Sequence, residues 1–194
     1  MIQKIPLIGV VYVLGIALAN CALCEEPKAE MRLSGIAGGM SYSTAMGDNY
    51  QAYTQPRGAV AEAWIAEPHL LGPVFDLHAT VNYLPYQVRG LTDSTLNQWS
   101  FLLGIETGRG ANANWVKPFV SLDIGGVYSK LSIPAAVTSP TQNSSFLFAG
   151  QVRGGVDIPI WGKLSVQFAS PLKVVFSAKK FVTLNGDVSL RWAL

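Results

Sequence analysis

The sequence predicts an all-β protein, an eight-stranded antiparallel up-and-down transmembrane β-barrel. Two observations lead to this prediction. Apolar and polar residues alternate along eight segments of the chain, and a period of two is what sorts residues onto the two faces of a strand. The connections between these segments are alternately long and short, which is typical of outer-membrane barrels with longer external loops and short periplasmic turns.

The composition favours a β protein that contacts an apolar environment. Of the 194 residues, 49% are hydrophobic and 13% are charged. The only continuous apolar run lies at the N-terminus, so the other hydrophobic residues are dispersed by alternation. The formal net charge is +2 and there is no basic patch, which gives no reason to expect a nucleic acid partner.

The N-terminus is predicted to be an export signal. Lys4 supplies a positive charge, residues 5–18 are apolar, and small residues follow. We therefore expect a signal peptide over residues 1–24, with cleavage after Ala19 or after Cys24.

A polar leader over residues 25–30 is expected to separate the signal peptide from the barrel, which is predicted to span residues 31–194. Both cysteines of the chain, Cys21 and Cys24, precede the barrel. The barrel is therefore expected to fold without disulfides or thiol chemistry.

The most regular alternation closes the chain. A free terminal strand would leave an unpaired sheet edge, so residues 182–194 are predicted to pair with the first strand. Pro171 cannot donate a backbone hydrogen bond, which predicts a rim or a bulge in the seventh strand. The expected strands are residues 31–43, 58–67, 73–86, 98–106, 115–128, 146–158, 164–176 and 182–194.

The second strand is the least clear, because Glu62 and Trp64 compete with Ala63 and Ile65 for the apolar face. The connections that are expected to be long cover residues 44–57, 87–97 and 129–145. Those that are expected to be short cover residues 68–72, 108–114 and 159–162.

Aromatic residues gather at the predicted strand ends, and two interfacial belts are typical of a spanning barrel. The belt on the long-loop side is predicted to contain Tyr42, Tyr83, Trp99, Tyr128, Phe146 and Phe181. The belt on the short-turn side is predicted to contain Phe75, Trp115, Trp161 and Trp192.

The polar parity of the strands is expected to face the barrel interior. Charges of both signs occur there, and we expect them to pair, because an unpaired buried charge is costly. An eight-stranded barrel is about filled by its own side chains, so a plugged interior is predicted. This lumenal polar network is expected to contain Asp76, His78, Glu106, Lys117, Asp123, Gln151, Arg153, Asp157, Lys163, Asp187 and Arg191.

No catalytic, cofactor-binding or metal-binding residue is predicted. His78 with Asp76 is the nearest approach to a catalytic pair, and Thr80 lies beside it, but neither a substrate path nor an oxyanion hole is visible in the sequence. The other histidine, His69, lies in a turn, and two distant histidines do not suggest a metal site.

From residue 31 to residue 194 the chain resembles the small eight-stranded outer-membrane barrels, the group that contains OmpX and the transmembrane domain of OmpA. The resemblance rests on the strand that runs from Lys117 to Gly126 and on the alternating C-terminus. It implies the outer membrane of a Gram-negative-type bacterium, with membrane lipid and the barrel-assembly machinery as partners. The residues that resemble the assembly signal are Gly186, Val188, Leu190, Trp192 and Leu194.

The expected function is therefore a structural or adhesin-like role that the extracellular loops carry, with an unidentified ligand outside the cell and no enzymatic activity. Two alternatives remain for an outer-membrane barrel, a lipid-modifying enzyme and a narrow channel. A third is a soluble periplasmic barrel of the lipocalin type, in which the apolar parity would face inward around a ligand.

Overall fold

The computed structural model describes residues 32–46, 52–66, 75–91, 93–107, 115–133, 141–177 and 181–194, with only the backbone of residues 141–143. The expected signal peptide and leader, both cysteines and His69 lie outside these residues. Among the described residues, no helix is long and apolar enough to span a membrane.

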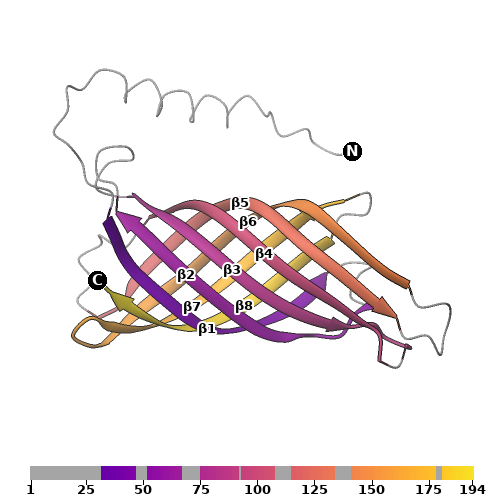
Figure 1. The fold of residues 1–194 in the computed structure, drawn as a ribbon. Coiled ribbons are helices and arrows are strands. Elements are labelled where there is room, and N and C mark those ends of the chain that lie inside the picture. The colour runs from indigo at the N-terminus through magenta and orange to yellow at the C-terminus, as the bar shows by residue number, and fades with distance from the viewer. Residues whose placement is uncertain are drawn as a thin grey trace, which may run out of the picture.

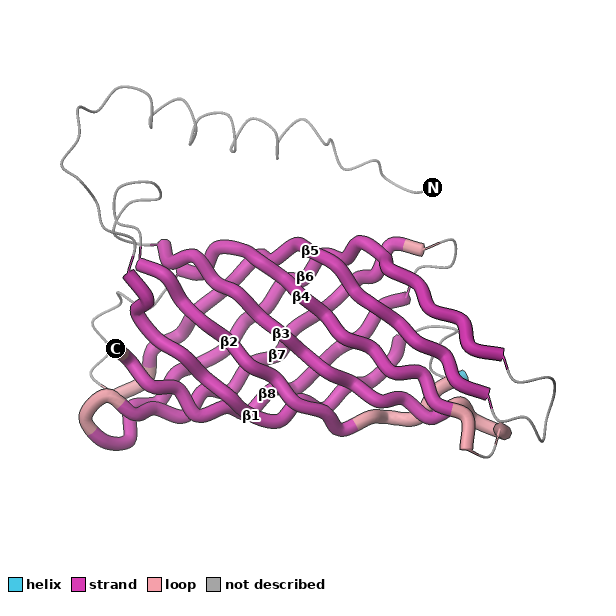
Figure 2. Tube along the Cα trace, viewed as in Figure 1, coloured by secondary structure: helices cyan, strands magenta, loops and turns pink. Residues whose placement is uncertain are grey.

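Eight strands form one closed barrel in which each strand pairs with its neighbours in chain order, all antiparallel (Figures 1 and 2). The predicted fold class is confirmed. The strands are β1 (Arg32–Met46), β2 (Arg57–Ala66), β3 (Phe75–Gln87), β4 (Thr95–Thr107), β5 (Lys117–Ile133), β6 (Thr141–Trp161), β7 (Leu164–Phe176) and β8 (Phe181–Ala193).

The barrel closes between its first and last strands. β8 pairs with β1 from Gly35, opposite Ala193, to Met46, opposite Val182. The two ends of the barrel are named here by what they carry. β1 begins and β8 ends at the terminal end, on the left of Figure 1, and the loop end holds the β1–β2, β3–β4, β5–β6 and β7–β8 connections.

Gly39 is required by the close approach of β1 to β8. A Cβ atom at this position would overlap the carbonyl oxygen of Val188 and the Cα of Ser189. Neither backbone atom can move away without breaking the closing ladder.

We expect Gly39→Ala to lower the free energy of unfolding by about 1 to 3 kcal/mol, because the added methyl group overpacks this seam. Unfolding in urea, followed by tryptophan fluorescence in detergent micelles, measures the change. Gly38→Ala is the matched control, since a Cβ there would meet nothing within 4 Å. Equal stability of the two variants would contradict the proposed clash.

The outer wall is apolar and the inner face is mostly polar along the strands. Leu103 is 67% exposed and Met40 is 66% exposed, and both point away from the barrel axis. The lipocalin-like alternative is therefore wrong, because it needed this parity to face inward. In β2 the structure resolves the ambiguity: Glu62 and Trp64 are buried in the interior, and the outer face is rich in alanine.

The expected alternation of connection lengths is wrong, although the fold class it predicted is right. The β5–β6 connection covers only residues 134–140, whereas β4–β5 at the other end covers residues 108–116. The expected long loop 129–145 is largely strand, with Ser129 opposite Ser145 and Ile133 opposite Thr141. This hairpin is rich in serine and threonine, and its residues do not alternate between apolar and polar. For this reason the sequence predicted a loop.

Outward aromatic residues form a row at the loop end. Tyr83 lies opposite Trp99, Trp99 opposite Tyr128, and Tyr128 opposite Phe146, so the row crosses four strands. The rings of Tyr83 and Trp99 are 4.4 Å apart between centroids. Phe181 was wrongly predicted for this belt, because it is 8% exposed and lies inside the barrel.

At the terminal end the predicted aromatic residues are all exposed on the outside, as a second belt requires. They are Phe75, Trp115, Trp161 and Trp192. The wall between the two belts carries the apolar side chains of all eight strands, which is the arrangement of a barrel that crosses a bilayer.

Pro171 marks neither a rim nor a bulge. The β7–β8 pairing skips Ser170 and Pro171, but the register is the same on both sides of the gap, at Ala169 with Asp187 and at Leu172 with Leu184. Proline has no N–H to donate. The Ser170 hydroxyl instead donates to the carbonyl oxygen of Asn185, at 3.4 Å.

We expect Pro171→Val to raise the free energy of unfolding by about 1 kcal/mol, because valine supplies the missing N–H for the ladder. Ser170→Ala should lower it in the native background and have a smaller effect in the Pro171→Val background. Denaturant unfolding of the two single variants and the double variant tests this coupling. Additive effects would show that the hydroxyl does not replace the missing donor.

Candidate functional site: the lumen and the loop end

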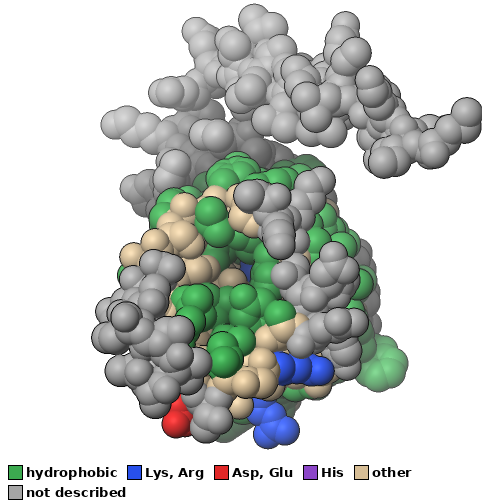
Figure 3. All heavy atoms as spheres, turned by 90° about the vertical axis from the view of Figure 1, so that its right-hand side faces the viewer, with side chains coloured by type: hydrophobic (Ala, Val, Ile, Leu, Met, Phe, Trp, Pro, Cys, Tyr) green, Lys and Arg blue, Asp and Glu red, His purple; other side chains and the backbone are tan. Residues whose placement is uncertain are grey.

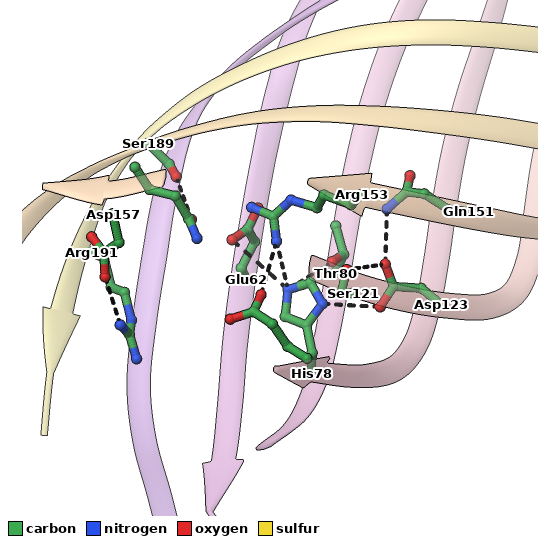
Figure 4. A network of polar contacts seen from close by, with 12 residues as sticks. Glu62, His78, Thr80, Ser121, Asp123, Gln151, Arg153, Asp157, Ser189 and Arg191 are labelled. Atoms are coloured by element: carbon green, nitrogen blue, oxygen red, sulfur yellow. Dashed lines mark hydrogen bonds and ion pairs between the residues drawn. The ribbon is translucent and has the colours of Figure 1, made fainter. Parts of the chain in front are cut away.

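Charged side chains meet in the middle of the lumen (Figure 4). Arg153 on β6 reaches across the interior, and its Nη2 donates to Oε1 of Glu62 on β2 at 2.5 Å. Its Nη1 lies 3.6 Å from a carboxylate oxygen of Glu106 and 3.2 Å from Nε2 of His78. The side chains of all four residues have no exposed surface.

Asp123 on β5 holds the other side of the histidine. Its Oδ1 lies 3.1 Å from Nδ1 of His78, while its Oδ2 accepts hydrogen bonds from Ser121 at 2.9 Å and from Gln151 at 3.1 Å. A carboxylate with three partners and no exposed side-chain surface is well satisfied. We name Glu62, His78, Glu106, Asp123, Gln151 and Arg153 the central network.

Aromatic rings fill the space around these charges. The Arg153 guanidinium lies 5.0 Å from the ring centroid of Phe119. The Trp64 ring stacks on the His78 ring, with 5.2 Å between the two ring centroids. Towards the terminal end, Arg191 lies 4.6 Å from the ring of Trp64 and donates to Oδ2 of Asp157 at 2.8 Å. Cation–π contacts of this kind gain strength where water is excluded.

Lys173 and Asp187 extend the polar interior towards the loop end. Nζ of Lys173 donates to Oγ of Ser100 at 2.8 Å, and Ser41 donates to Oδ1 of Asp187 at 2.6 Å. Lys173 is buried with 1% of its surface exposed, so its amine is almost closed off from solvent.

The interior near the loop end is apolar, which differs from the expected polar plug. A cluster of buried side chains from seven strands fills this region, and we name it the apolar layer. It consists of Ala45, Leu84, Tyr86, Leu102, Val127, Ala149, Val175 and Phe181. Figure 3, which faces the loop end, shows hydrophobic side chains around the mouth of the barrel.

Tyr53 packs on the apolar layer from the β1–β2 connection. Its ring lies 6.0 Å from that of Tyr86 and 5.7 Å from that of Phe181, edge to face in both cases. The Tyr86 hydroxyl lies 3.0 Å from the hydroxyl of Ser43. Three aromatic rings thus meet where the lumen opens towards the loops.

The predicted lumenal residues do not all lie in one place. Five of them belong to the central network, Asp187 bonds to Ser41, and Arg191 pairs with Asp157. Asp76 and Lys117 are half-buried near the terminal end. Lys163 is exposed in the β6–β7 turn, outside the barrel, so its assignment to the lumen is wrong.

Sequence reasoning missed Glu62 and Lys173. Glu62 was not predicted, because alanine suits either face and the pattern of β2 does not say which parity is lumenal. Lys173 shares the parity of Gln167, which the alternation in β7 already placed on the polar side. Parity therefore contained the signal for Lys173 but not for Glu62.

Thr80, His78 and Asp123 are arranged like a hydroxyl nucleophile with its base and orienting carboxylate. Oγ1 of Thr80 lies 3.1 Å from Nε2 of His78, and Asp123 takes the position at Nδ1 that the sequence suggested for Asp76. Nε2 is, however, shared with Arg153, and all of these side chains are buried. Among the described residues, these groups form a buried network of hydrogen bonds and ion pairs.

No metal site occurs in the part of the chain that the structure describes: no three His, Cys, Asp or Glu side chains there are grouped to hold an ion. The residues of the predicted assembly signal lie on β8 and at Leu194, and their role in assembly stays a prediction.

At the loop end, the β1–β2 connection is tied to the end of β3. Tyr53 forms a bridge with Val88, Thr54 N donates to Gln87 O at 2.9 Å, and Arg89 N donates to Ala52 O at 2.9 Å. A groove with a volume of about 610 Å³ lies along this junction and the β3–β4 turn. This groove is open to the outside at the loop end.

No protein-family model and no curated protein matches the chain. Solved structures do. Neisserial surface protein A (NspA) has a TM-score of 0.63 at 10% identity, over 82% of this chain and 96% of that one. OprG from Pseudomonas aeruginosa has a TM-score of 0.55 at 12% identity, over 87% and 99%. Ail, the attachment invasion locus protein of Yersinia pestis, has a TM-score of 0.54 at 14% identity, over 82% and 98%. The chain has the fold of the small eight-stranded outer-membrane barrels.

Proposed function

We propose that this outer-membrane barrel acts through its loop end, as a surface that binds a ligand outside the cell. Its lumen serves as structural support for that surface, and it neither conducts nor catalyses. The single observation that carries the proposal is the filling of the lumen. The central network has no exposed side-chain surface, and the apolar layer lies between this network and the loop end.

A channel would need a continuous polar path through both regions. The Arg153–Glu62 pair spans the interior from β6 to β2, and the apolar layer offers an ion few ligands in place of water. Both features oppose conduction, because an ion that enters an apolar layer loses its hydration without compensation.

An enzyme would need a reacting group that a substrate can reach. Thr80 and His78 have suitable chemistry, but both are buried in the interior. The loop end, in contrast, carries exposed polar side chains on a rigid scaffold, which is where binding residues are usually found. Ail, which has this fold, was solved in complex with the heparin analogue sucrose octasulfate.

Two experiments test the proposal. In planar bilayers the refolded barrel should give no current above that of the lipid alone, and stable single-channel steps would refute the closed lumen. In the second, a laboratory Gram-negative strain that displays the full chain is compared with one in which an Asn-Gly turn replaces residues 88–94.

The strain with the native loop should be retained on epithelial monolayers and the shortened one should not. A matched variant with connection 108–116 shortened, at the terminal end, should bind like the native chain. Equal retention of all three strains, or of none, would refute a binding role for the loop end.

A further inference from the structure

The groove at the loop end is held rigid on both sides. On one side, Thr54 Oγ1 accepts a hydrogen bond from Gln87 N at 3.1 Å, and Nε of Arg89 donates to Tyr53 O at 3.0 Å. On the other, the β3–β4 turn is closed by Val88 N donating to Ser94 O at 3.0 Å. The ring of Tyr53 anchors the junction on the apolar layer. Such a site loses little conformational entropy when it binds a ligand.

Two residues of the β3–β4 turn have a left-handed backbone conformation. Gly90 has φ 79° and Asp93 has φ 60°, both in the left-handed region. Asp and Asn tolerate this region better than other non-glycine residues. Asp93 is therefore held with its side chain exposed at the edge of the groove.

The lining combines hydrogen-bond donors and acceptors with little net charge. Arg89 supplies a guanidinium and Asp93 a carboxylate, so the two formal charges cancel. The polar lining residues are Thr54, Gln87, Arg89, Asp93, Ser94 and Thr95. Val88 and Leu91 add two half-buried apolar side chains to the same wall.

This chemistry selects among ligand classes. An anionic ligand would be attracted by Arg89 but repelled by Asp93, and a cationic one would meet the reverse. A neutral ligand with many hydroxyl groups can use both, because a hydroxyl donates to a carboxylate and accepts from a guanidinium. The C–H face of a sugar ring can pack on Leu91 and Val88, and the groove is of a size that small ligands occupy.

We propose that this groove binds neutral saccharide units, with Asp93 accepting from ring hydroxyls and Arg89 donating to them. The proposal rests on the binding role of the loop end and names the ligand class and the site. The charged side chains of the described residues gather at one edge of the rim in Figure 3.

The test uses the full barrel in lipid nanodiscs on an array of neutral oligosaccharides of hexoses and N-acetylhexosamines, with sialylated and sulfated ones beside them. The best neutral oligosaccharide is then titrated by calorimetry. Asp93→Asn should weaken its binding at least tenfold, because asparagine keeps the left-handed backbone but removes the charge. Arg89→Gln should weaken it to a similar degree. Lys130→Gln, at the loop end of β5 but outside the groove, should leave it unchanged.

Each variant is first checked for the folded barrel by its gel migration with and without boiling. The saccharide proposal is overturned if the native barrel binds no neutral oligosaccharide, or if Asp93→Asn and Arg89→Gln bind as the native barrel does. It is also overturned if only sulfated glycans bind and Lys130→Gln weakens them equally. Unchanged retention of cells that carry Asp93→Asn and Arg89→Gln would reject this site while leaving the wider binding role of the loop end intact.

Discussion

Arg153→Ala is expected to lower the free energy of unfolding by about 3 to 5 kcal/mol, because it leaves buried charges without a partner. Glu62 would lose the hydrogen bond of 2.5 Å from Arg153, and the imidazole of His78, with Nε2 3.8 Å from its other carboxylate oxygen, is a weaker partner for a full negative charge. The cavity left beside Phe119 adds to the cost. Unfolding in guanidinium, in detergent micelles, measures the loss.

Two further variants make this expectation specific to the ion pair. Lys163→Ala removes an exposed cation in the β6–β7 turn and should change stability by less than about 0.5 kcal/mol. The double variant Arg153→Met with Glu62→Leu removes both charges and should recover most of the loss, since apolar replacement of a buried pair is often neutral. Stability of Arg153→Ala close to that of the native barrel would contradict the central network.

Leu190→Arg is expected to prevent accumulation of the folded barrel in membranes. Leu190 is on the outer wall of β8, opposite Val166 on β7 and Gly38 on β1, between the two aromatic belts. A cation in the apolar band costs about 2 to 4 kcal/mol near the bilayer midplane. The measurement is the amount of heat-modifiable protein in the outer-membrane fraction.

Trp161→Arg is the control for depth. Trp161 is also exposed on the outside, but at the end of β6, where the same charge costs about 0 to 1 kcal/mol. It should therefore accumulate normally. Normal amounts of folded Leu190→Arg would mean that this face of β8 does not contact lipid.

The fold could be predicted because most strands carry a two-sided pattern. In β8 and β3 the polar parity holds side chains such as Asp187 and His78, and the structure buries both. β2 has no such contrast, since alanine suits either face, and only the register with β1 and β3 decides it. Outside the apolar band the alternation of apolar and polar residues disappears. The sequence therefore predicted a loop where the β5–β6 hairpin lies.

The partners within the central network could not be predicted. His78 meets Asp123 because β3 and β5 both flank β4 and the barrel curves, whereas Asp76 is nearer only in sequence. Arg153 meets Glu62 across the lumen, between strands that share no ladder. Such contacts depend on the closure of the whole barrel, which no local pattern encodes.

The Arg153–Glu62 pair therefore constrains how the protein enters a membrane. Before β8 meets β1, a partly inserted sheet would present Arg153 and Lys173 on a face with nothing opposite to neutralise them. The β1–β2 hairpin inserted alone would bring Glu62 into hydrocarbon without the guanidinium of Arg153. Insertion and closure are therefore expected to occur together, because unpaired charges in hydrocarbon destabilise a half-inserted barrel. The buried charges of the central network thus favour the closed barrel over partly inserted states.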